Sequence, residues 1–225
     1  CLQYTDDALL AAYSPTPVLL SKPQVVASAR SREKFSVKPL RRLLAQEKWQ
    51  DCRTCFTLDL DDYRVLLQDK PNIAPEELAQ ACKWLTKDLI DFPLEQAAVD
   101  VFLSPTQLAG KNKVYVIVTK LEILEKIKKI CEDTSLELFA VDIPELALRN
   151  LIVSQYPSQD IAVLYGRDNF ISMVVISDLN IQFIRKVNAN LKEGSNLDSI
   201  ALELQRSLDY YQSQMRRPPP HKLLI

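Results

Sequence analysis

Residues that could bind a phosphate group are the first candidates for chemistry in this sequence, yet the glycines that such a site needs are scarce. The chain has 225 residues and only three glycines, Gly110, Gly166 and Gly194, no two of which lie close together. Phosphate loops usually need clustered glycines, because backbone N–H groups must approach the anion without a Cβ in the way. The sequence therefore excludes a P-loop and a dinucleotide-binding fingerprint.

Residues that could ligate a metal or act as nucleophiles are also few. His221 is the only histidine, which excludes zinc sites built on several histidines. Cys52 and Cys55 form a lone C-x-x-C, which could be a redox pair or half of a metal site. The motif has no second copy and enters a predicted strand, so we favour packing at a strand start. The odd total of five cysteines favours a reducing compartment.

An acidic stretch, formed by Asp59, Asp61 and Asp62, could bind a cation through its carboxylate oxygens. No glycine is present to fold this loop tightly around an ion, so we favour a polar turn.

Two consecutive tyrosines near the C-terminus, Tyr210 and Tyr211, could stack on a ligand. Tyr211 continues the apolar face of a predicted helix, and we therefore expect core packing there.

The charge pattern limits the macromolecular partners. The formal net charge of −1 argues against a protein that binds nucleic acid over its whole surface, and no apolar run approaches the roughly 20 residues that span a bilayer. Between residues 30 and 48, seven basic residues accompany only two acids and could touch anionic lipid headgroups. We favour a solvated loop and helix face. The basic residues are Arg30, Arg32, Lys34, Lys38, Arg41, Arg42 and Lys48.

The elements that must position these residues alternate between strands and helices. Apolar residues that repeat with a helical period predict helices at 39–49, 75–91, 121–131, 142–152 and 197–215. A hairpin is predicted at 1–13, single strands at 53–60, 63–68, 97–103, 114–118 and 136–141, and an antiparallel meander at 161–165, 171–176 and 181–184. This alternation predicts an α/β body with a smaller α+β insertion.

Two of the predicted helices carry detailed signals. In the helix at 142–152, Asp142 is expected to cap the N-terminus, with Glu145 as its reciprocal partner. The helix at 75–91 has a clear apolar stripe, and Pro93 prevents its continuation. The stripe consists of Leu78, Ala81, Cys82, Leu85 and Leu89.

Three segments in register resemble a known family. The segments are WLTKDLIDFPLE at 84–95, VDIPELALRN at 141–150 and ELQRSLDYYQSQ at 203–214. They resemble the MshI family of mannose-sensitive-haemagglutinin (MSHA) pilus biogenesis, which is related to the pilus assembly protein PilM and to the cytoplasmic part of the type II secretion protein GspL. The resemblance extends from about residue 54 to the C-terminus, whereas residues 14–50 match poorly.

The resemblance implies an actin-like ATPase (ribonuclease H-like) fold with an inserted small α+β subdomain and a truncated second lobe. In this layout, residues 1–53 begin the first lobe, 54–134 form the insertion, 135–157 return to the first lobe and 158–225 begin the second. The chain does not start with Met and ends in an apolar run, so we interpret it as a fragment of a longer protein.

The resemblance also implies two phosphate-binding hairpin turns, each with an Asp that positions the metal and a Gly that admits the phosphate. In the first turn, Gln3 stands at the expected acid position, and the loop around Thr5 has no glycine. In the second, Gly166 is present, Leu164 lies near the expected acid position, and Asp168 is an acid at a shifted position. Loss of both acids removes most of the charge that holds Mg²⁺ against a triphosphate.

We therefore expect no catalytic residue, cofactor or metal. The expected function is a non-catalytic scaffold on the cytoplasmic face of the bacterial inner membrane, in the assembly platform of a type IV (MSHA-like) pilus or a type II secretion-like machine. The scaffold would link a bitopic PilN-like membrane partner to the assembly ATPase and would bind no nucleic acid. Two alternatives are an active ATPase that binds ATP and Mg²⁺ at Gln3, Thr5, Gly166 and Asp168, and a membrane-surface binder that uses the basic cluster.

A partner surface is the remaining prediction. PilM relatives bind an extended segment of their membrane partner in a groove between subdomains, and such a groove needs an apolar rim. Phe92 and Pro93 lie just past a strong helix stop, and together with Leu89 they are expected to form part of this contact surface. A core cluster that caps the helix is the alternative.

Overall fold

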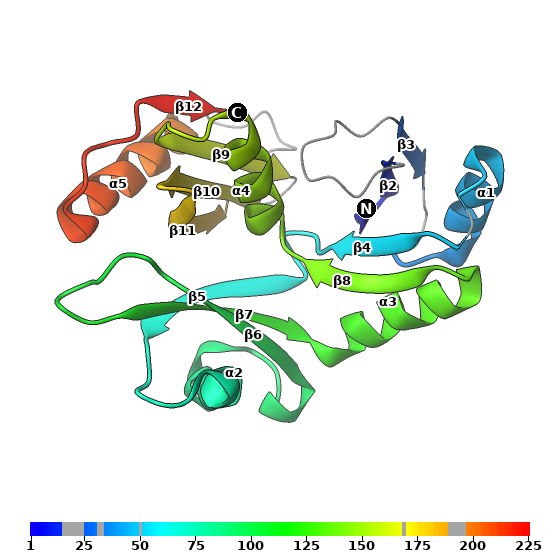
Figure 1. The fold of residues 1–225 in the computed structure, drawn as a ribbon, viewed down its shortest axis with the longest axis horizontal. Helices are drawn as coiled ribbons and strands as arrows, with labels where there is room; N and C mark the ends of the chain where they lie inside the picture. The colour runs from blue at the N-terminus through cyan, green and yellow to red at the C-terminus, as the bar shows by residue number, and fades with distance from the viewer. Residues whose placement is uncertain (15–24, 31–33, 50, 168–169, 189–196) are drawn as a thin grey trace. The chain divides into compact units, whose positions relative to one another are not determined.

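The computed structural model describes residues 1–14, 25–30, 34–49, 51–167, 170–188 and 197–225 (Figure 1). The chain forms two compact units, each made of two stretches of sequence. The first unit comprises Cys1–Tyr63 and Lys120–Ala147, and the second comprises Arg64–Thr119 and Leu148–Ile225. The predicted domain boundaries at 53/54, 134/135 and 157/158 remain a prediction.

A five-stranded sheet organises the first unit, in the order β3-β2-β1-β4-β8. Strands β1, β2 and β3 form an antiparallel meander, whereas β4 and β8 continue the sheet in parallel with β1. The predicted hairpin at 1–13 is confirmed, with Gln3 opposite Leu10. The strands are β1 (Leu2–Tyr4), β2 (Ala8–Tyr13), β3 (Val25–Arg30), β4 (Arg53–Thr57) and β8 (Glu137–Asp142).

Two amphipathic helices, α1 (Val37–Glu47) and α3 (Leu121–Thr134), pack against each other in this unit. Each ends at a residue in the left-handed conformation, Lys48 with φ of 57° and Ser135 with φ of 55°. Their buried residues follow the helical repeat that the sequence predicts. These residues are Leu40, Leu43 and Leu44 on α1, and Ile127, Ile130 and Cys131 on α3.

A buried hydrogen bond also belongs to the first unit. Helix α4 (Pro144–Gln155) begins just after Asp142, whose Oδ1 accepts the Ile143 N–H at 2.8 Å. Glu145 is fully buried, and its Oε2 accepts the Tyr63 hydroxyl at 2.6 Å from 82 residues away in the sequence. The capping motif did not predict this partner for Glu145.

The second unit begins with a three-stranded sheet in the order β5-β7-β6, which we call the insertion (residues 64–119). One face carries α2, and Leu78 and Cys82 of that helix join Ala97 of β6 and Val114 and Val116 of β7 in an apolar core. The strands are β5 (Tyr63–Asp69), β6 (Ala97–Leu103) and β7 (Lys113–Lys120). The helices are η1 (Pro75–Glu77), α2 (Leu78–Leu85), η2 (Lys87–Leu89) and η3 (Leu94–Gln96).

The predicted continuous helix at 75–91 is wrong, because the structure divides it into η1, α2 and η2. At the end of α2, the buried Thr86 donates its hydroxyl to the Lys83 carbonyl at 2.6 Å, a local bond that competes with helix continuation. The apolar stripe is broken at the same point. Leu78 and Cys82 are buried, whereas Leu85 and Leu89 are 55% and 53% exposed.

A four-stranded sheet in the order β11-β10-β9-β12 completes the second unit, and we call it the meander sheet. The predicted antiparallel meander of β9, β10 and β11 is confirmed, and β12 joins β9 in parallel. Tyr211 and Met215 of α5 pack on Met173, Val175 and Phe183 of this sheet, so the core role predicted for Tyr211 is confirmed. The elements are β9 (Ile161–Arg167), β10 (Phe170–Ser177), β11 (Asn180–Asn188), α5 (Leu197–Met215) and β12 (Lys222–Leu224).

None of the helices within the described residues combines the length and the apolar character needed to cross a membrane.

Candidate functional site

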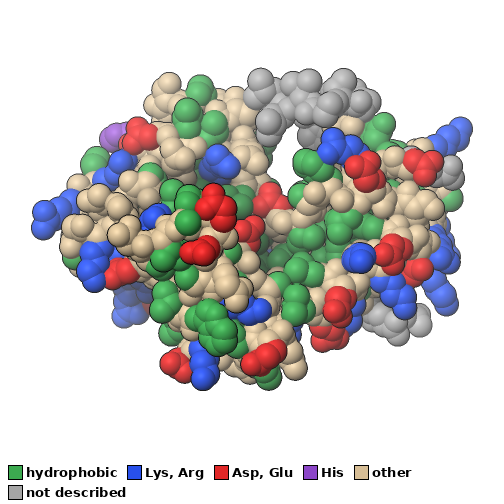
Figure 2. Space-filling model, turned by 60° about the horizontal axis from the view of Figure 1, so that its bottom comes forward, with side chains coloured by type: hydrophobic (Ala, Val, Ile, Leu, Met, Phe, Trp, Pro, Cys, Tyr) green, Lys and Arg blue, Asp and Glu red, His purple; other side chains and the backbone are tan. Residues whose placement is uncertain are grey.

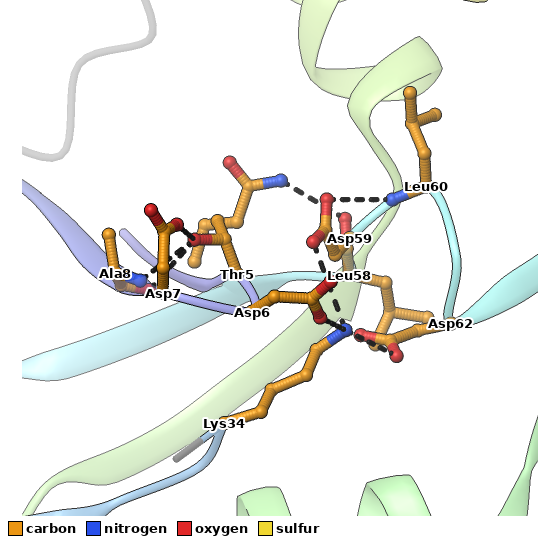
Figure 3. Close-up of polar contacts among 10 residues, drawn as sticks. Thr5, Asp6, Asp7, Ala8, Lys34, Leu58, Asp59, Leu60 and Asp62 are labelled. Carbon is orange, nitrogen blue, oxygen red and sulfur yellow. Dashed lines mark hydrogen bonds and ion pairs between the residues drawn. The ribbon is translucent and has the colours of Figure 1, made fainter. Parts of the chain in front are cut away.

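The turn between β1 and β2, which we call the first hairpin turn, is closed by its own hydrogen bonds (Figure 3). The Thr5 N–H donates to the Ala8 carbonyl at 2.8 Å, and the Ala8 N–H donates to Thr5 Oγ1 at 3.0 Å. The Thr5 hydroxyl, which is fully buried, lies 3.1 Å from the Ala8 carbonyl oxygen and 3.2 Å from Asp7 Oδ1. Two N–H groups of the turn are therefore already used, and the Asp7 carboxylate is engaged by the Thr5 hydroxyl of the same turn.

Gln3 occupies the position where the resemblance implies an acid. Its Nε2 donates to the Leu58 carbonyl at 3.2 Å, which connects β1 to the segment that follows β4. An uncharged amide adds no negative charge to hold Mg²⁺. Gln3 and Thr5, two of the positions named for the ATPase alternative, thus form contacts within the fold.

Lys34 places an ammonium group among three carboxylates next to this turn (Figure 3). Its Nζ lies 2.8 Å from Asp62 Oδ1, 3.7 Å from Asp6 Oδ1 and 3.8 Å from Asp59 Oδ2. The side chains of Lys34, Asp59 and Asp62 are 20%, 6% and 11% exposed, whereas that of Asp6 is 56% exposed. We call these four residues the Lys34 cluster. The cation beside the acidic stretch is thus a lysine ammonium.

The pKa values in the Lys34 cluster reflect burial and charge together. Burial works to lower the pKa of Lys34, but the hydrogen bond to Asp62 and the charges of Asp62, Asp59 and Asp6 outweigh it, so this pKa is raised. Burial raises the pKa of Asp62, and the contacts with Lys34 only partly oppose this effect. Across the described residues, no group of three or more His, Cys, Asp or Glu side chains is arranged to hold a metal ion.

The second hairpin, between β9 and β10, also departs from the implied phosphate site. Leu164 pairs with Met173 and packs against the core of the meander sheet, so an apolar side chain stands near the expected acid position. Gly166 lies within β9 opposite Ile171 rather than in the turn. Asp168 lies outside the described residues.

Apolar side chains are exposed at the end of α2 and in η2. Trp84, Leu85 and Leu89 are 64%, 55% and 53% exposed, and we call them the α2–η2 surface. Among the residues predicted for a partner contact, Leu89 and Pro93 are exposed, whereas Phe92 is half-buried and packs against the core of the insertion. Figure 2, in which the bottom of Figure 1 comes forward, shows hydrophobic side chains among charged ones on this face.

Sequence reasoning missed Trp84 and placed Leu85 in the core. The helical repeat counts Leu85 and Leu89 as one stripe with Leu78, but Leu85, in the last turn of α2, and Leu89, in η2, are both more than half exposed. A threonine followed by Lys87 and Asp88 is only a weak helix-stop signal.

The basic cluster at 30–48 offers fewer positive charges to an anionic lipid surface than its composition indicates. Lys34 is engaged by three carboxylates, and the Arg41 guanidinium donates to the Asp133 carbonyl at 2.9 and 3.3 Å, near the C-terminus of α3. Arg32 lies outside the described residues. The exposed remainder is Arg30, Lys38, Arg42 and Lys48.

The C-x-x-C motif sits at the start of β4, with both cysteines half-buried and neither of them in a disulfide. Burial, followed by the nearby Asp142 carboxylate, raises the pKa of Cys55. Reactive cysteines need a lowered pKa, so this environment favours the unreactive thiol.

Comparisons with known proteins bear on the fold. Neither the protein-family models nor the curated proteins include a match. Among solved structures, the chain is similar to one described as a PilM-PilN type IV pilus biogenesis complex, with 15% identity and a TM-score of 0.72 over 95% of this chain and 77% of that one. It is also similar to the cytoplasmic domain of EpsL, an inner membrane component of the type II secretion system of Vibrio cholerae, with 13% identity and a TM-score of 0.57 over 100% and 84%.

A third similar structure is a protein of unknown function from Bacteroides thetaiotaomicron, described as having an actin-like ATPase fold. It shows 9% identity and a TM-score of 0.54, over 100% of this chain and 90% of that one. The expected α/β architecture is confirmed: the chain has an actin-like ATPase fold.

Proposed function

We propose that this chain is a non-catalytic docking component of an inner-membrane assembly platform, serving a type IV pilus, of the MSHA kind that the resemblance indicates, or a type II secretion-like machine. It would act on the cytoplasmic face of the membrane, bind a bitopic PilN-like partner and connect that partner to the assembly ATPase. The likeness to structures described as a PilM-PilN complex and as the EpsL cytoplasmic domain supports this choice of machine.

The first hairpin turn is the observation that carries the non-catalytic part of the proposal. Its Thr5 and Ala8 N–H groups bond within the turn, Gln3 replaces the expected acid, and the Lys34 ammonium is held by Asp6, Asp59 and Asp62. A triphosphate with Mg²⁺ needs free N–H donors and carboxylates that face the metal. Here the Thr5 and Ala8 N–H groups and the carboxylates of Asp6, Asp59 and Asp62 have partners within the chain.

Nucleotide titration tests this part of the proposal. Saturating ATP with excess Mg²⁺ is expected to leave the melting temperature within about 1 °C of the nucleotide-free value, because a ligand that does not bind the native state cannot stabilise it. Differential scanning fluorimetry measures the shift, with Mg²⁺ alone as the control. A rise of several degrees that depends on both ATP and Mg²⁺ would favour the alternative, an active actin-like ATPase with atypical phosphate loops.

The α2–η2 surface, together with Pro93, is the part of the chain that we assign to partner contact. Exposed Trp, Leu and Pro side chains offer apolar area, and a tryptophan at 64% exposure has much surface left to bury. Phe92, which precedes Pro93, packs against the core of the insertion and so anchors this part of the chain to it.

Replacing Leu89 with Ser is expected to weaken binding of the cytoplasmic segment of a PilN-like protein by about tenfold, the effect of losing roughly 1.4 kcal/mol of apolar contact. Fluorescence anisotropy with the labelled segment measures the affinity. Leu202→Ser on α5 is the matched control, since Leu202 is 51% exposed and lies outside the α2–η2 surface. Equal losses for the two variants, or none for Leu89→Ser, would contradict the assignment.

A further inference from the structure

The insertion leaves and re-enters the first unit in sequence, but two of its buried hydroxyls, those of Thr106 and Tyr115, bond to Gln182 of the meander sheet. We propose that Gln182 forms a buried clasp that fixes the insertion to the meander sheet, so that the two behave as one body. The clasp consists of Thr106, Tyr115, Ser177 and Gln182, all within the second unit.

Both polar atoms of the Gln182 side-chain amide form hydrogen bonds in the clasp. Gln182 is fully buried on β11; its Oε1 accepts the Thr106 hydroxyl at 2.7 Å, and its Nε2 donates to the Ser177 carbonyl at 2.9 Å. Its backbone carbonyl also accepts the Tyr115 hydroxyl at 3.3 Å. Thr106 and Tyr115, both of the insertion, are 8% and 1% exposed. Water therefore cannot easily replace these partners.

Apolar contacts surround the clasp on the insertion side. Leu108, two residues after Thr106, and Leu67 of β5 pack against the core of the meander sheet, which includes Met173, Val175 and Phe183. Apolar contacts favour association but fix little geometry, because burial of area is non-directional. The hydrogen bonds of Gln182 set the register of this contact, since each buried group has a defined partner at short distance.

The Thr106 hydroxyl and the Gln182 amide should behave as a unit, because removal of either group leaves the other buried without its partner. Thr106→Val removes the donor to Gln182 Oε1, and Gln182→Leu leaves the Thr106 hydroxyl and the Ser177 carbonyl without the amide. Such unpaired buried groups are costly, whereas removal of both partners at once can be nearly neutral. We therefore expect the double variant to lose no more stability than the worse single variant.

The clasp has a consequence for partner docking, and this step rests on the proposed function. The insertion is joined to the first unit by two chain crossings, at Tyr63/Arg64 and Thr119/Lys120, and to the meander sheet by the clasp and a shared core. A partner bound at the α2–η2 surface would then be coupled to the meander sheet.

Hydrogen–deuterium exchange of the full chain without any partner tests the clasp, so its outcome is separate from that of the proposed function. Gln182→Leu is expected to raise exchange by about tenfold at 104–115 of the insertion as well as at 177–182, with β1 and β2 unchanged. Thr134→Val, which removes a hydroxyl bond to the Ile130 carbonyl in α3 of the first unit, is the matched control and should leave the insertion unchanged.

Two results would overturn the inference. One is faster exchange at 177–182 with wild-type protection at 104–115, which would show that the insertion is held independently of Gln182. The other is additive loss of melting temperature in Thr106→Val, Gln182→Leu and the double variant. Thr106→Val is nearly isosteric, so it keeps the exchange test available if Gln182→Leu does not fold: it should raise exchange at 104–115 and at 177–182 alike.

Discussion

Replacing Lys34 with Met is expected to lower the free energy of unfolding by about 2–3 kcal/mol at neutral pH, between the effect of breaking a buried ion pair and that of a surface pair. The methionine fills similar space but leaves Asp59 and Asp62, which are 6% and 11% exposed, without the ammonium that balances them. Urea unfolding at pH 7 measures the change. Lys126→Met is the control, because its pair with Glu122 on α3 is at least half-exposed and its loss should change the stability far less than that of Lys34.

The pH dependence of this variant follows from the same cluster. The pKa of Lys34 is raised in the folded chain, so its stabilisation is fully present below pH 10.5, the ordinary lysine pKa, and is lost as the pH rises through the folded value. Burial raises the pKa of Asp62, so its protonated form is favoured in the fold. The difference in unfolding free energy between the wild type and Lys34→Met should therefore shrink at low pH, because Asp62 becomes neutral in both proteins. It should also shrink at strongly alkaline pH, because the wild type loses the charge of Lys34.

Two outcomes would contradict this account of the Lys34 cluster. A loss as small as that of Lys126→Met would mean that solvent already screens the three carboxylates. An unchanged deficit in the double variant Lys34→Met with Asp62→Asn would also contradict it, because removal of one uncompensated charge should restore part of the stability.

The local elements were largely predictable, since they depend on short-range periodicity. The strand predicted at 97–103 is β6 (Ala97–Leu103), and the first hairpin and the meander follow from alternating apolar residues with short polar turns. The helix at 75–91 was not predictable in its full length. The interruption falls at Thr86, which neither glycine nor proline marks, and the residues Ile90 and Phe92 that follow it pack against the core of the insertion.

The candidate site was harder to predict because its contacts join distant segments. Lys34 was grouped with a basic cluster, and Asp59 and Asp62 with an acidic loop, although the fold pairs the two groups. The sequence shows that position 3 carries glutamine and not an acid. It does not show that the Gln3 side chain bonds to the Leu58 carbonyl, 55 residues away. The resemblance thus indicated which groups the first hairpin turn lacks, whereas only the fold shows the contacts that Gln3 and Lys34 make there.

Replacing Glu145 with Ala is expected to have the second large effect, a loss of about 3–4 kcal/mol, since it removes a fully buried carboxylate that accepts the Tyr63 hydroxyl and leaves a cavity. Tyr63→Phe should cost about 2 kcal/mol, within the range for removing one partner of a buried hydrogen bond. Chemical denaturation measures both. Tyr13→Phe is the control for loss of a phenol hydroxyl, because Tyr13 is only half-buried and stacks on Trp49 through its ring.

The position of this pair in the chain explains why the effect should exceed that of one hydrogen bond. Tyr63 is the last residue of the first stretch of its unit, and Glu145 lies two residues before the end of the second stretch. Their bond therefore fixes, relative to each other, two of the points where the chain leaves the first unit. If the pair has this role, Tyr63→Phe should also speed amide exchange at 142–147, beyond the loss at residue 63 itself. If amide exchange changes only next to residue 63, the bond between Tyr63 and Glu145 stabilises its immediate surroundings alone, and the proposed role is wrong.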